Sequence, residues 1–167
     1  MRFHFPVIII DEDFRSENAS GLGIRALADA IEKEGMDVLG VTSYGDLTSF
    51  AQQQSRASAF ILSVDDEELA HEEEATIAEL RAFVEEIRHK NAEIPIFLHG
   101  ETRTSRHIPN DILRELHGFI HMHEDTPEFI ARHVVREARS YLDSLPPPFF
   151  RALTHYAADG SYSWHCP

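Results

Sequence analysis

Short apolar runs alternate with amphipathic stretches along this chain, and the alternation limits the folds that it can adopt. The runs are rich in β-branched residues and too short for buried helices, so each one predicts a buried strand. The five predicted strands are Phe3–Ile10, Val38–Thr42, Ala59–Val64, Ile94–His99 and Gly118–Met122. Apolar strands that alternate with helices form a parallel sheet covered on both faces.

Between these runs, apolar residues recur at helical spacing. Five helices are predicted, with core faces Ile24/Leu27/Ala28/Ile31, Leu47/Phe50/Ala51/Gln54, Ile77/Leu80/Val84/Ile87, Ile108/Ile112/Leu113/Leu116 and Phe129/Ile130/Val134/Ala138/Tyr141/Leu145. Gly35 ends the first helix, and Thr126 with Pro127 begins the last. The predicted fold is an α/β three-layer sandwich, flavodoxin-like or receiver-like, with strand order 2-1-3-4-5.

The 167 residues predict one domain over 1–145 and an extended arm over 146–167. Pro146-Pro147-Pro148 ends the last helix because proline cannot continue it. The arm is rich in large apolar side chains, namely Phe149, Phe150, Leu153, Tyr156, Tyr162 and Trp164. It is too short to form its own core. We expect it to dock on the domain, on another subunit or on a further domain.

The balance of 29 acidic against 15 basic residues gives a formal charge of −14, which disfavours nucleic-acid binding. No apolar run has the roughly 20 residues of a membrane span, and the start lacks a signal-peptide pattern. Cys166 is the single cysteine, so no internal disulfide is expected. These features predict a cytoplasmic protein without membrane contact. The carboxylates and 11 histidines make pH-dependent association a further hypothesis.

Asp11 and Asp13 follow the first predicted strand, and an acidic pair there resembles the magnesium-binding pair of a response-regulator receiver domain. The family's phosphoacceptor aspartate, hydroxyl and lysine fall on Val64, Gly100 and Met122. Asp65 is one residue late, and one residue along a strand reverses the direction of a side chain. The sequence therefore predicts the receiver fold without phosphoacceptor chemistry.

The last predicted strand carries residue types that zinc prefers: His117, His121 and His123 share parity, and Glu124 and Asp125 follow. In a parallel sheet of this kind, helices cover both faces of each strand. We therefore expect His121 and His123 to be hydrogen-bonded at the strand end, and we expect no bound metal.

No cofactor or anion site is expected either. Lys33 and Lys90 lie at charged helix ends, where lysine is normally solvated, and not in a pocket for a Schiff base. Gly21-Leu22-Gly23 lacks the third glycine of a dinucleotide fingerprint. Arg103 and Arg106 are expected to be solvated loop residues. The sequence therefore predicts no catalytic, cofactor-binding or metal-binding residue.

Residues 145–167, LPPPFFRALTHYAADGSYSWHCP, resemble the junction segment of the Orn/Lys/Arg decarboxylase major family. That segment carries Leu-Pro-Pro-x-Phe-x-x-Ala-Leu, then a tyrosine, then Tyr-Ser-Trp-x-x-Pro. Residues 124–131 are similar to the family's EDT-x-x-F-I-A step into the last helix of its N-terminal domain. The form Tyr162-Ser163-Trp164 is more similar to the inducible arginine decarboxylase branch than to the lysine or ornithine branches.

This resemblance implies that residues 1–145 are an N-terminal "wing" domain without catalytic residues, which helps dimers assemble into a decamer. It implies that residues 146–167 link the wing to a pyridoxal-phosphate-binding catalytic domain that begins just beyond Pro167. The parent enzyme would release carbon dioxide from arginine first, or from lysine or ornithine, and consume a proton, in acid resistance or polyamine synthesis. The chain alone is expected to bind no cofactor and to be inactive. The alternative is a free-standing, degenerate receiver-like module for protein interaction.

Overall fold

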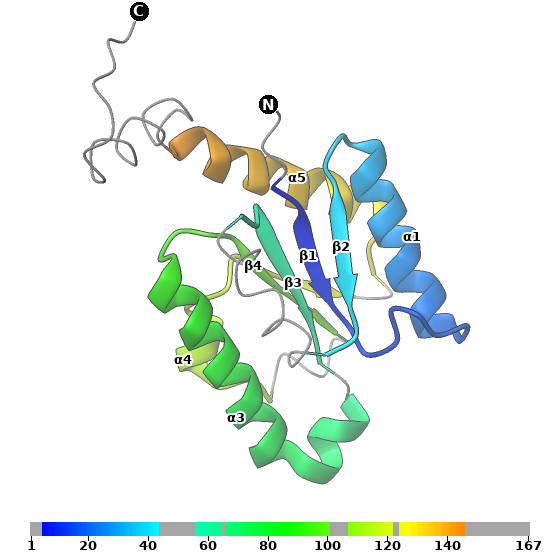
Figure 1. Cartoon of the computed structure of the whole chain (residues 1–167). Coiled ribbons are helices and arrows are strands. Elements are labelled where there is room, and N and C mark those ends of the chain that lie inside the picture. Colours follow the sequence, from blue (N-terminus) through cyan, green and yellow to red (C-terminus); the bar gives the residue numbers. More distant parts are fainter. Residues whose placement is uncertain (1–4, 44–55, 65, 101–106, 122–123, 146–167) are drawn as a thin grey trace, which may run out of the picture.

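A five-stranded parallel sheet lies at the centre of the computed structural model, which describes residues 5–43, 56–64, 66–100, 107–121 and 124–145, without the side chains of 66–73. The strands are β1 (Val7–Ile10), β2 (Val38–Val41), β3 (Ala59–Ser63), β4 (Ile96–Gly100) and β5 (Gly118–His121). Their order is β2-β1-β3-β4-β5, and all neighbours are parallel (Figure 1). The predicted strand order is confirmed.

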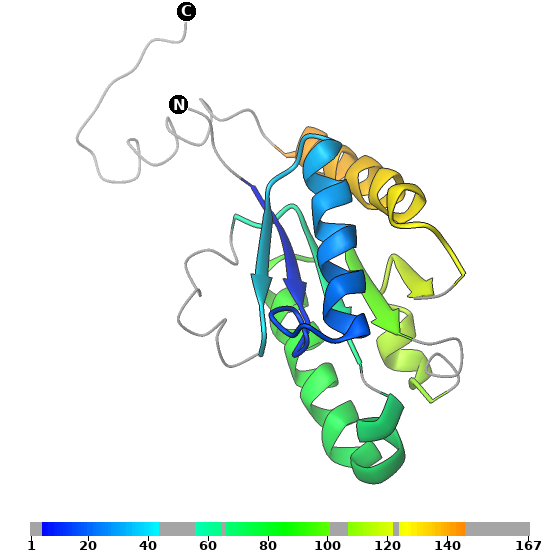
Figure 2. The ribbon, with the colours of Figure 1, turned by 90° about the vertical axis from the view of Figure 1, so that its right-hand side faces the viewer.

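Helices cover both faces of this sheet. They are α1 (Ala19–Lys33), α3 (Asp66–Lys90), α4 (Asn110–Leu113) and α5 (Pro127–Ser144). α1 and α5 pack on one face, and α3 and α4 lie on the other (Figures 1 and 2). The three-layer sandwich expected from the sequence is therefore confirmed.

Alternate strand residues divide the core into two clusters. On the α3/α4 face, Ile8, Ile10, Phe60, Leu62 and Leu98 pack with apolar residues of α3 and α4. On the α1/α5 face, the residues between them pack with α1 and α5, among them Val7, Ile9, Ala59, Ile61 and Phe97. Because both faces are apolar, a polar side chain at a strand end must find a partner there.

Local sequence signals set the ends of α1 and α5. The side chain of Asn18 accepts a hydrogen bond from Gly21 N at 2.8 Å and caps α1. Gly35 has a φ of 96°, which favours glycine, just past the end of that helix. Thr126 caps α5, and Pro127 occupies the first helical position, as predicted.

Two helices differ from their predictions. α4 ends at Leu113, whereas the prediction extended to Leu116, because the chain continues there through tight turns rather than helical bonds. Phe129 was predicted to be buried and is instead 57% exposed. The buried side of α5 is centred on residues such as Val134 and Ala138, and Phe129 lies on the opposite side.

Several predictions fall on residues outside the described ranges: the second helix over Leu47–Gln54, the boundary at Pro146 and the aromatic arm. Four predicted strand ends coincide with the observed ones, namely Ile10, Val38, Ala59 and Gly118. Four others differ by one or two residues, and the predicted ends at Phe3 and Met122 lie outside the described residues. No helix in the described part of the chain is both long and apolar enough to cross a membrane.

Candidate functional site

A polar cluster of Asp11, Ser63 and His99 lies at the carboxyl edge of the sheet, with the serine half-buried and the other two buried. Asp11 is 5% exposed and His99 is 6% exposed. Ser63 pairs in register with His99, and Asp11 follows the β1 residue whose partner directly precedes Ser63. The preceding residue of each strand packs on the α3/α4 face. The three polar side chains therefore lie on the α1/α5 face, because successive side chains alternate.

Hydrogen bonds join the cluster into one chain. The Ser63 hydroxyl donates to Asp11 Oδ2 at 2.7 Å, and its oxygen lies 3.3 Å from His99 Nδ1. Asp11 Oδ1 accepts from the backbone N–H of Asp13 at 2.8 Å. A serine hydroxyl has one proton, and an ionised carboxylate only accepts. We infer that Nδ1 of His99 carries a proton and donates to Ser63.

This polarity determines what the cluster can do. A serine nucleophile must give its proton to a histidine base, which a carboxylate orients. Here the Ser63 proton is directed at Asp11, and the serine lies in the middle of the chain. The arrangement satisfies a buried carboxylate with two donors and ties β1, β3 and β4 together. We therefore describe the cluster as a structural clamp, because its hydrogen bonds connect three strands.

The loop between β1 and α1 is held by its own hydrogen bonds. Arg25 Nη1 donates to the carbonyl oxygens of Phe14 and Ser16 at 2.8 and 2.7 Å. The side-chain amide of Asn18 donates to Asp13 Oδ1 at 3.0 Å. Asp13 is therefore engaged within the loop and does not extend from it as an open ligand.

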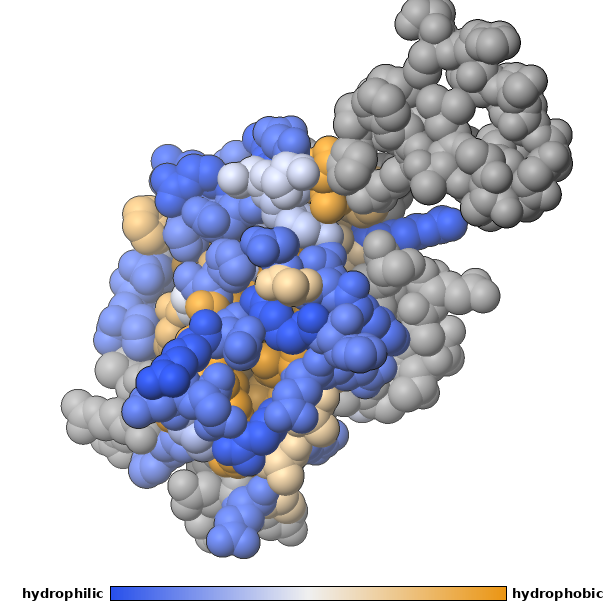
Figure 3. All heavy atoms as spheres, turned by 90° about the vertical axis from the view of Figure 1, so that its left-hand side faces the viewer, coloured by the Kyte–Doolittle hydropathy of each residue, from blue (hydrophilic) through white to orange (hydrophobic). Residues whose placement is uncertain are grey.

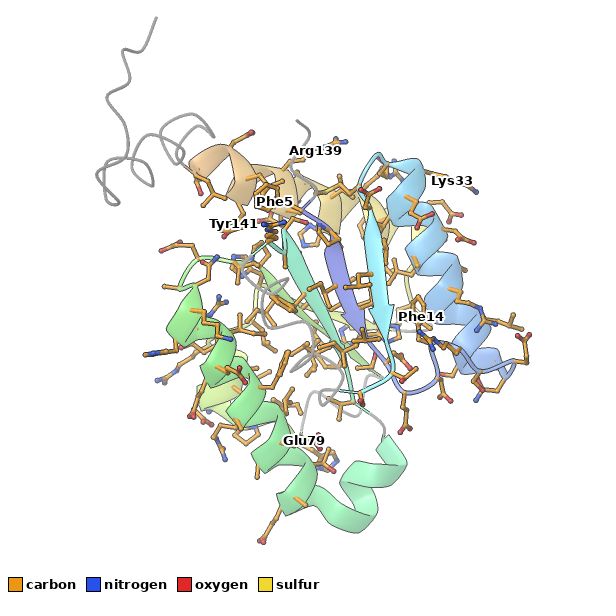
Figure 4. All side chains as sticks on the ribbon, in the orientation of Figure 1. Phe5, Phe14, Lys33, Glu79, Arg139 and Tyr141 are labelled. Atoms are coloured by element: carbon orange, nitrogen blue, oxygen red, sulfur yellow. The ribbon has the colours of Figure 1, made fainter. Side chains whose placement is uncertain are left out.

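Close packing around glycines supports the same loop. A Cβ atom on Gly21 would overlap the carbonyl oxygen of Ser16, and one on Gly40 would overlap the ring of Phe14. Figure 4 places Phe14 beside the lower end of β2. Gly21 and Gly23 lie within α1, so Gly21-Leu22-Gly23 is a helical segment. The missing side chain of Gly21 lets the loop backbone at Ser16 approach the helix closely.

Val64, which matches the receiver phosphoacceptor, lies on the other face of the sheet. Val64 is 8% exposed and belongs to the apolar cluster beneath α3. Gly100 ends β4 and is buried. Met122 and Asp65 lie outside the described residues. The position that matches the receiver phosphoacceptor is therefore occupied by an apolar side chain that packs in the core.

The histidines of the last strand do not converge. His117 and His121 are four residues apart, about 13 Å along a strand. The ring of His117 lies 6.4 Å from that of Phe97, and the ring of His121 lies 4.8 Å from that of Phe119. His121 Nδ1 is buried without a hydrogen-bond partner among the described residues, which differs from the predicted bonding at that atom.

Metal and cofactor ligands are not assembled in the described part of the chain. No group of three or more His, Cys, Asp or Glu side chains there could hold a metal ion. Lys90 Nζ lies 3.3 Å from Glu86 Oε1 at an exposed helix end, and Lys33 extends from the exposed end of α1 (Figure 4). Neither lysine fits a pyridoxal phosphate site, which needs an enclosed lysine.

Sequence reasoning missed Ser63 and His99 as partners of Asp11. The available signal was a polar residue near the end of an otherwise apolar strand, in FILSV and again in IFLHG. The partners of the strands and their register were needed to bring the two together. Arg103, Arg106, His123 and the six large side chains of the arm lie outside the described residues.

Comparison with known proteins gives the family. The profile described as the Orn/Lys/Arg decarboxylase N-terminal domain matches residues 19–141. Lysine decarboxylase LdcA of Pseudomonas aeruginosa is 31% identical over 166 residues, 98% of this chain and 22% of the relative. The biodegradative arginine decarboxylase of Escherichia coli is 26% identical over 163 residues, 96% of this chain and 21% of the relative. The chain thus spans about a fifth of the length of these two relatives.

Comparison with solved structures agrees with this family match. Lysine decarboxylase A from Pseudomonas aeruginosa has a TM-score of 0.73 and 30% identity over 99% of this chain and 22% of its own. A response regulator receiver domain from Clostridium thermocellum has a TM-score of 0.61 over 84% of this chain and 99% of its own, but is only 10% identical, so it shares the fold alone. The family match covers well over half of the sequence, and the chain therefore belongs to the Orn/Lys/Arg decarboxylase family as an N-terminal domain of that family.

Proposed function

We propose that this chain is the non-catalytic assembly domain of a pyridoxal-phosphate-dependent decarboxylase of a basic amino acid. The observation that carries the proposal is the family match over residues 19–141. The carboxyl-edge cluster adds support, because its serine proton is directed at Asp11 and its buried groups satisfy one another. The parent would supply the cofactor site in its catalytic domain and release carbon dioxide while consuming a proton.

The proposal divides the chain at residue 145. Residues 1–145 are the wing, and residues 146–167 lead to the catalytic domain. Phe149, Phe150, Leu153, Tyr156, Tyr162 and Trp164 are the proposed contacts with that domain or with another subunit. The partners are the parent's own catalytic domain and further copies, from dimer to decamer, in the cytoplasm.

Arginine is the first proposed substrate, followed by lysine or ornithine. The form Tyr162-Ser163-Trp164 supports arginine. The identities of 31% to a lysine decarboxylase and 26% to an arginine decarboxylase support lysine as a close second. The two observations point to different substrates, so the assay must include all three amino acids.

The test is to express the uninterrupted reading frame that contains this chain and to measure carbon dioxide release from arginine, lysine and ornithine with pyridoxal phosphate. Release from one of them by the full frame, and none by residues 1–167, is the expected result. Failure of the full frame to decarboxylate any of the three would overturn the proposal. It would favour the alternative of a receiver-like interaction module.

A further inference from the structure

The outward side of α5 has an unusual composition for a solvated helix. Phe129, Arg132 and Arg136 lie at positions i, i+3 and i+7, opposite the buried side of the helix. We call these three residues the α5 stripe. Phe129 is 57% exposed, and it and Leu22 are the exposed large apolar side chains of the described residues. One exposed apolar residue is ordinary, but here two arginines accompany it at helical spacing.

Arginines of α5 differ in what they do within the domain. Arg139 Nη2 donates to the carbonyl oxygen of Glu34 at 2.6 Å and so ties α5 to the end of α1. Arg132 and Arg136 make their contacts within α5 itself, with Glu128, His133 and Glu137. Among the described residues, the stripe therefore does not hold the fold together. Aromatic and arginine side chains are enriched at protein interfaces.

The outward side of α3 offers a matching surface. Ala75, Ala78 and Ala82 are exposed and repeat the same i, i+3, i+7 spacing, over about 10 Å. Exposed acidic residues flank this alanine strip on both sides, namely Glu74, Glu79, Glu85 and Glu86. Figure 3 shows the face that carries α3 and α4 as hydrophilic with small apolar interruptions, and Figure 4 marks Glu79 on α3.

We propose that the α5 stripe packs against the alanine strip of α3 in a second copy of this chain. The small alanines admit the ring of Phe129, and Arg132 and Arg136 reach the flanking glutamates. Within one copy the two helices lie on opposite faces of the sheet (Figure 1), so the contact joins different copies. The inference rests on the proposed assembly role and assigns surfaces to it.

Charge favours this partner. With 29 acidic and 15 basic residues, two copies repel each other over most of their surfaces. A basic stripe facing an acidic helix is a contact where that repulsion becomes attraction. Because the two surfaces differ, a pair of associated copies still has one unused α5 stripe and one unused alanine strip. Further copies can bind there, so larger species form as the protein concentration rises.

The experiment is sedimentation velocity of the 167-residue chain over a range of concentrations at low ionic strength. The chain is expected to associate reversibly. The double variant R132E/R136E should weaken association by at least about tenfold, because like charges then face each other. The variant E79R/E86R should do the same from the other surface. Mixing the two variants should restore association, since each supplies the surface that the other reverses.

A matched control carries the same change in net charge elsewhere. Arg15 is exposed on the loop after β1, and Arg114 is exposed next to α4. The variant R15E/R114E should weaken association only by the added repulsion between two more negatively charged copies. A monomeric native chain, an equal effect of the control, or a mixture without association would each overturn the inference. None of these outcomes touches the decarboxylation assay, so the proposed function is tested separately.

Discussion

The two faces of the sheet differ most at its carboxyl edge. On the α1/α5 face, Asp11, Ser63 and His99 form a chain of hydrogen bonds in which Asp11 and His99 are buried. One residue further along β3, on the α3/α4 face, Val64 is part of an apolar cluster. In receiver domains the phosphoacceptor aspartate occupies the position that matches Val64. Here the Val64 side chain packs among apolar residues instead. The carboxyl edge of the sheet therefore has a hydrogen-bonded polar cluster on one face and close apolar packing on the other.

The largest expected effect concerns the loop on the α1/α5 face. Gly21→Ala should lower the free energy of unfolding by about 3 kcal/mol or more, because the new Cβ overlaps a backbone carbonyl oxygen that cannot move away cheaply. Gly23→Ala is the matched control, since nothing lies within 4 Å of its Cβ position. It should raise stability by about 0.5–1 kcal/mol. Urea unfolding measures both, and equal behaviour of the two variants would contradict the packing of this loop.

The α3/α4 face is tested next by Val64→Asp, which places a carboxylate at the receiver position. We expect a loss of about 3 kcal/mol, because an unpaired charge enters an apolar cluster. Val64→Ala should cost roughly 1–2 kcal/mol from lost packing alone. Acetyl phosphate should label neither the native chain nor this variant. Labelling of the native chain, detected by intact mass, would mean that the edge retains phosphoacceptor chemistry.

Ser63→Ala tests the clamp itself. Removing the hydroxyl leaves buried Asp11 without one of its two donors, and the cost should be about 1–3 kcal/mol. Ser58→Ala is its control on the same strand segment, because Ser58 is fully buried and its hydroxyl has no partner among the described residues. That change should be neutral or stabilising. If the two serine variants lost equal stability in urea unfolding, the hydrogen-bonded chain would not be a clamp.

The smallest effect is expected on the outer surface of the α3/α4 side. Arg81 Nε donates to Asp111 Oδ2 at 2.8 Å, and this hydrogen bond holds the pKa of Asp111 below its usual range. A lowered pKa in the folded state contributes stability above the ordinary value of 3.8, and the contribution is lost as the pH falls through the folded-state pKa. Asp111→Asn should therefore shift the urea midpoint slightly at pH 7 and less at pH 3. An equal shift at both values would argue against the ion pair, which is exposed and weak.

The fold was readable from the sequence because strand and helix periodicities are set by local patterns. The cap at Thr126 and the turn at Gly35 followed from short-range signals. The strand order followed from the order common to flavodoxin-like folds. Phe129 was misassigned because its apolar character suggested burial, whereas the phase of α5 places it outside. The short α4 shows the same limit, since apolar spacing alone did not mark where helical bonding stops.

The candidate site was harder to predict from the sequence than the fold. Ser63 and Asp11 are 52 residues apart, and their contact depends on which strands pair and in which register. A one-residue shift would have placed Ser63 on the other face and Val64 beside Asp11. The resemblance to the family came from motifs at residues 124–131 and in the arm, and the profile match over residues 19–141 then showed the family. The fold alone does not indicate the function.

The most direct test of the account is deletion of residues 1–145 from the parent enzyme. Sedimentation and carbon dioxide release would be measured for the intact and the shortened chains, both with pyridoxal phosphate. The account predicts a smaller assembly that still releases carbon dioxide at a comparable rate per catalytic domain. An unchanged assembly together with lost decarboxylation would contradict it, because the wing would then serve the reaction and not the assembly.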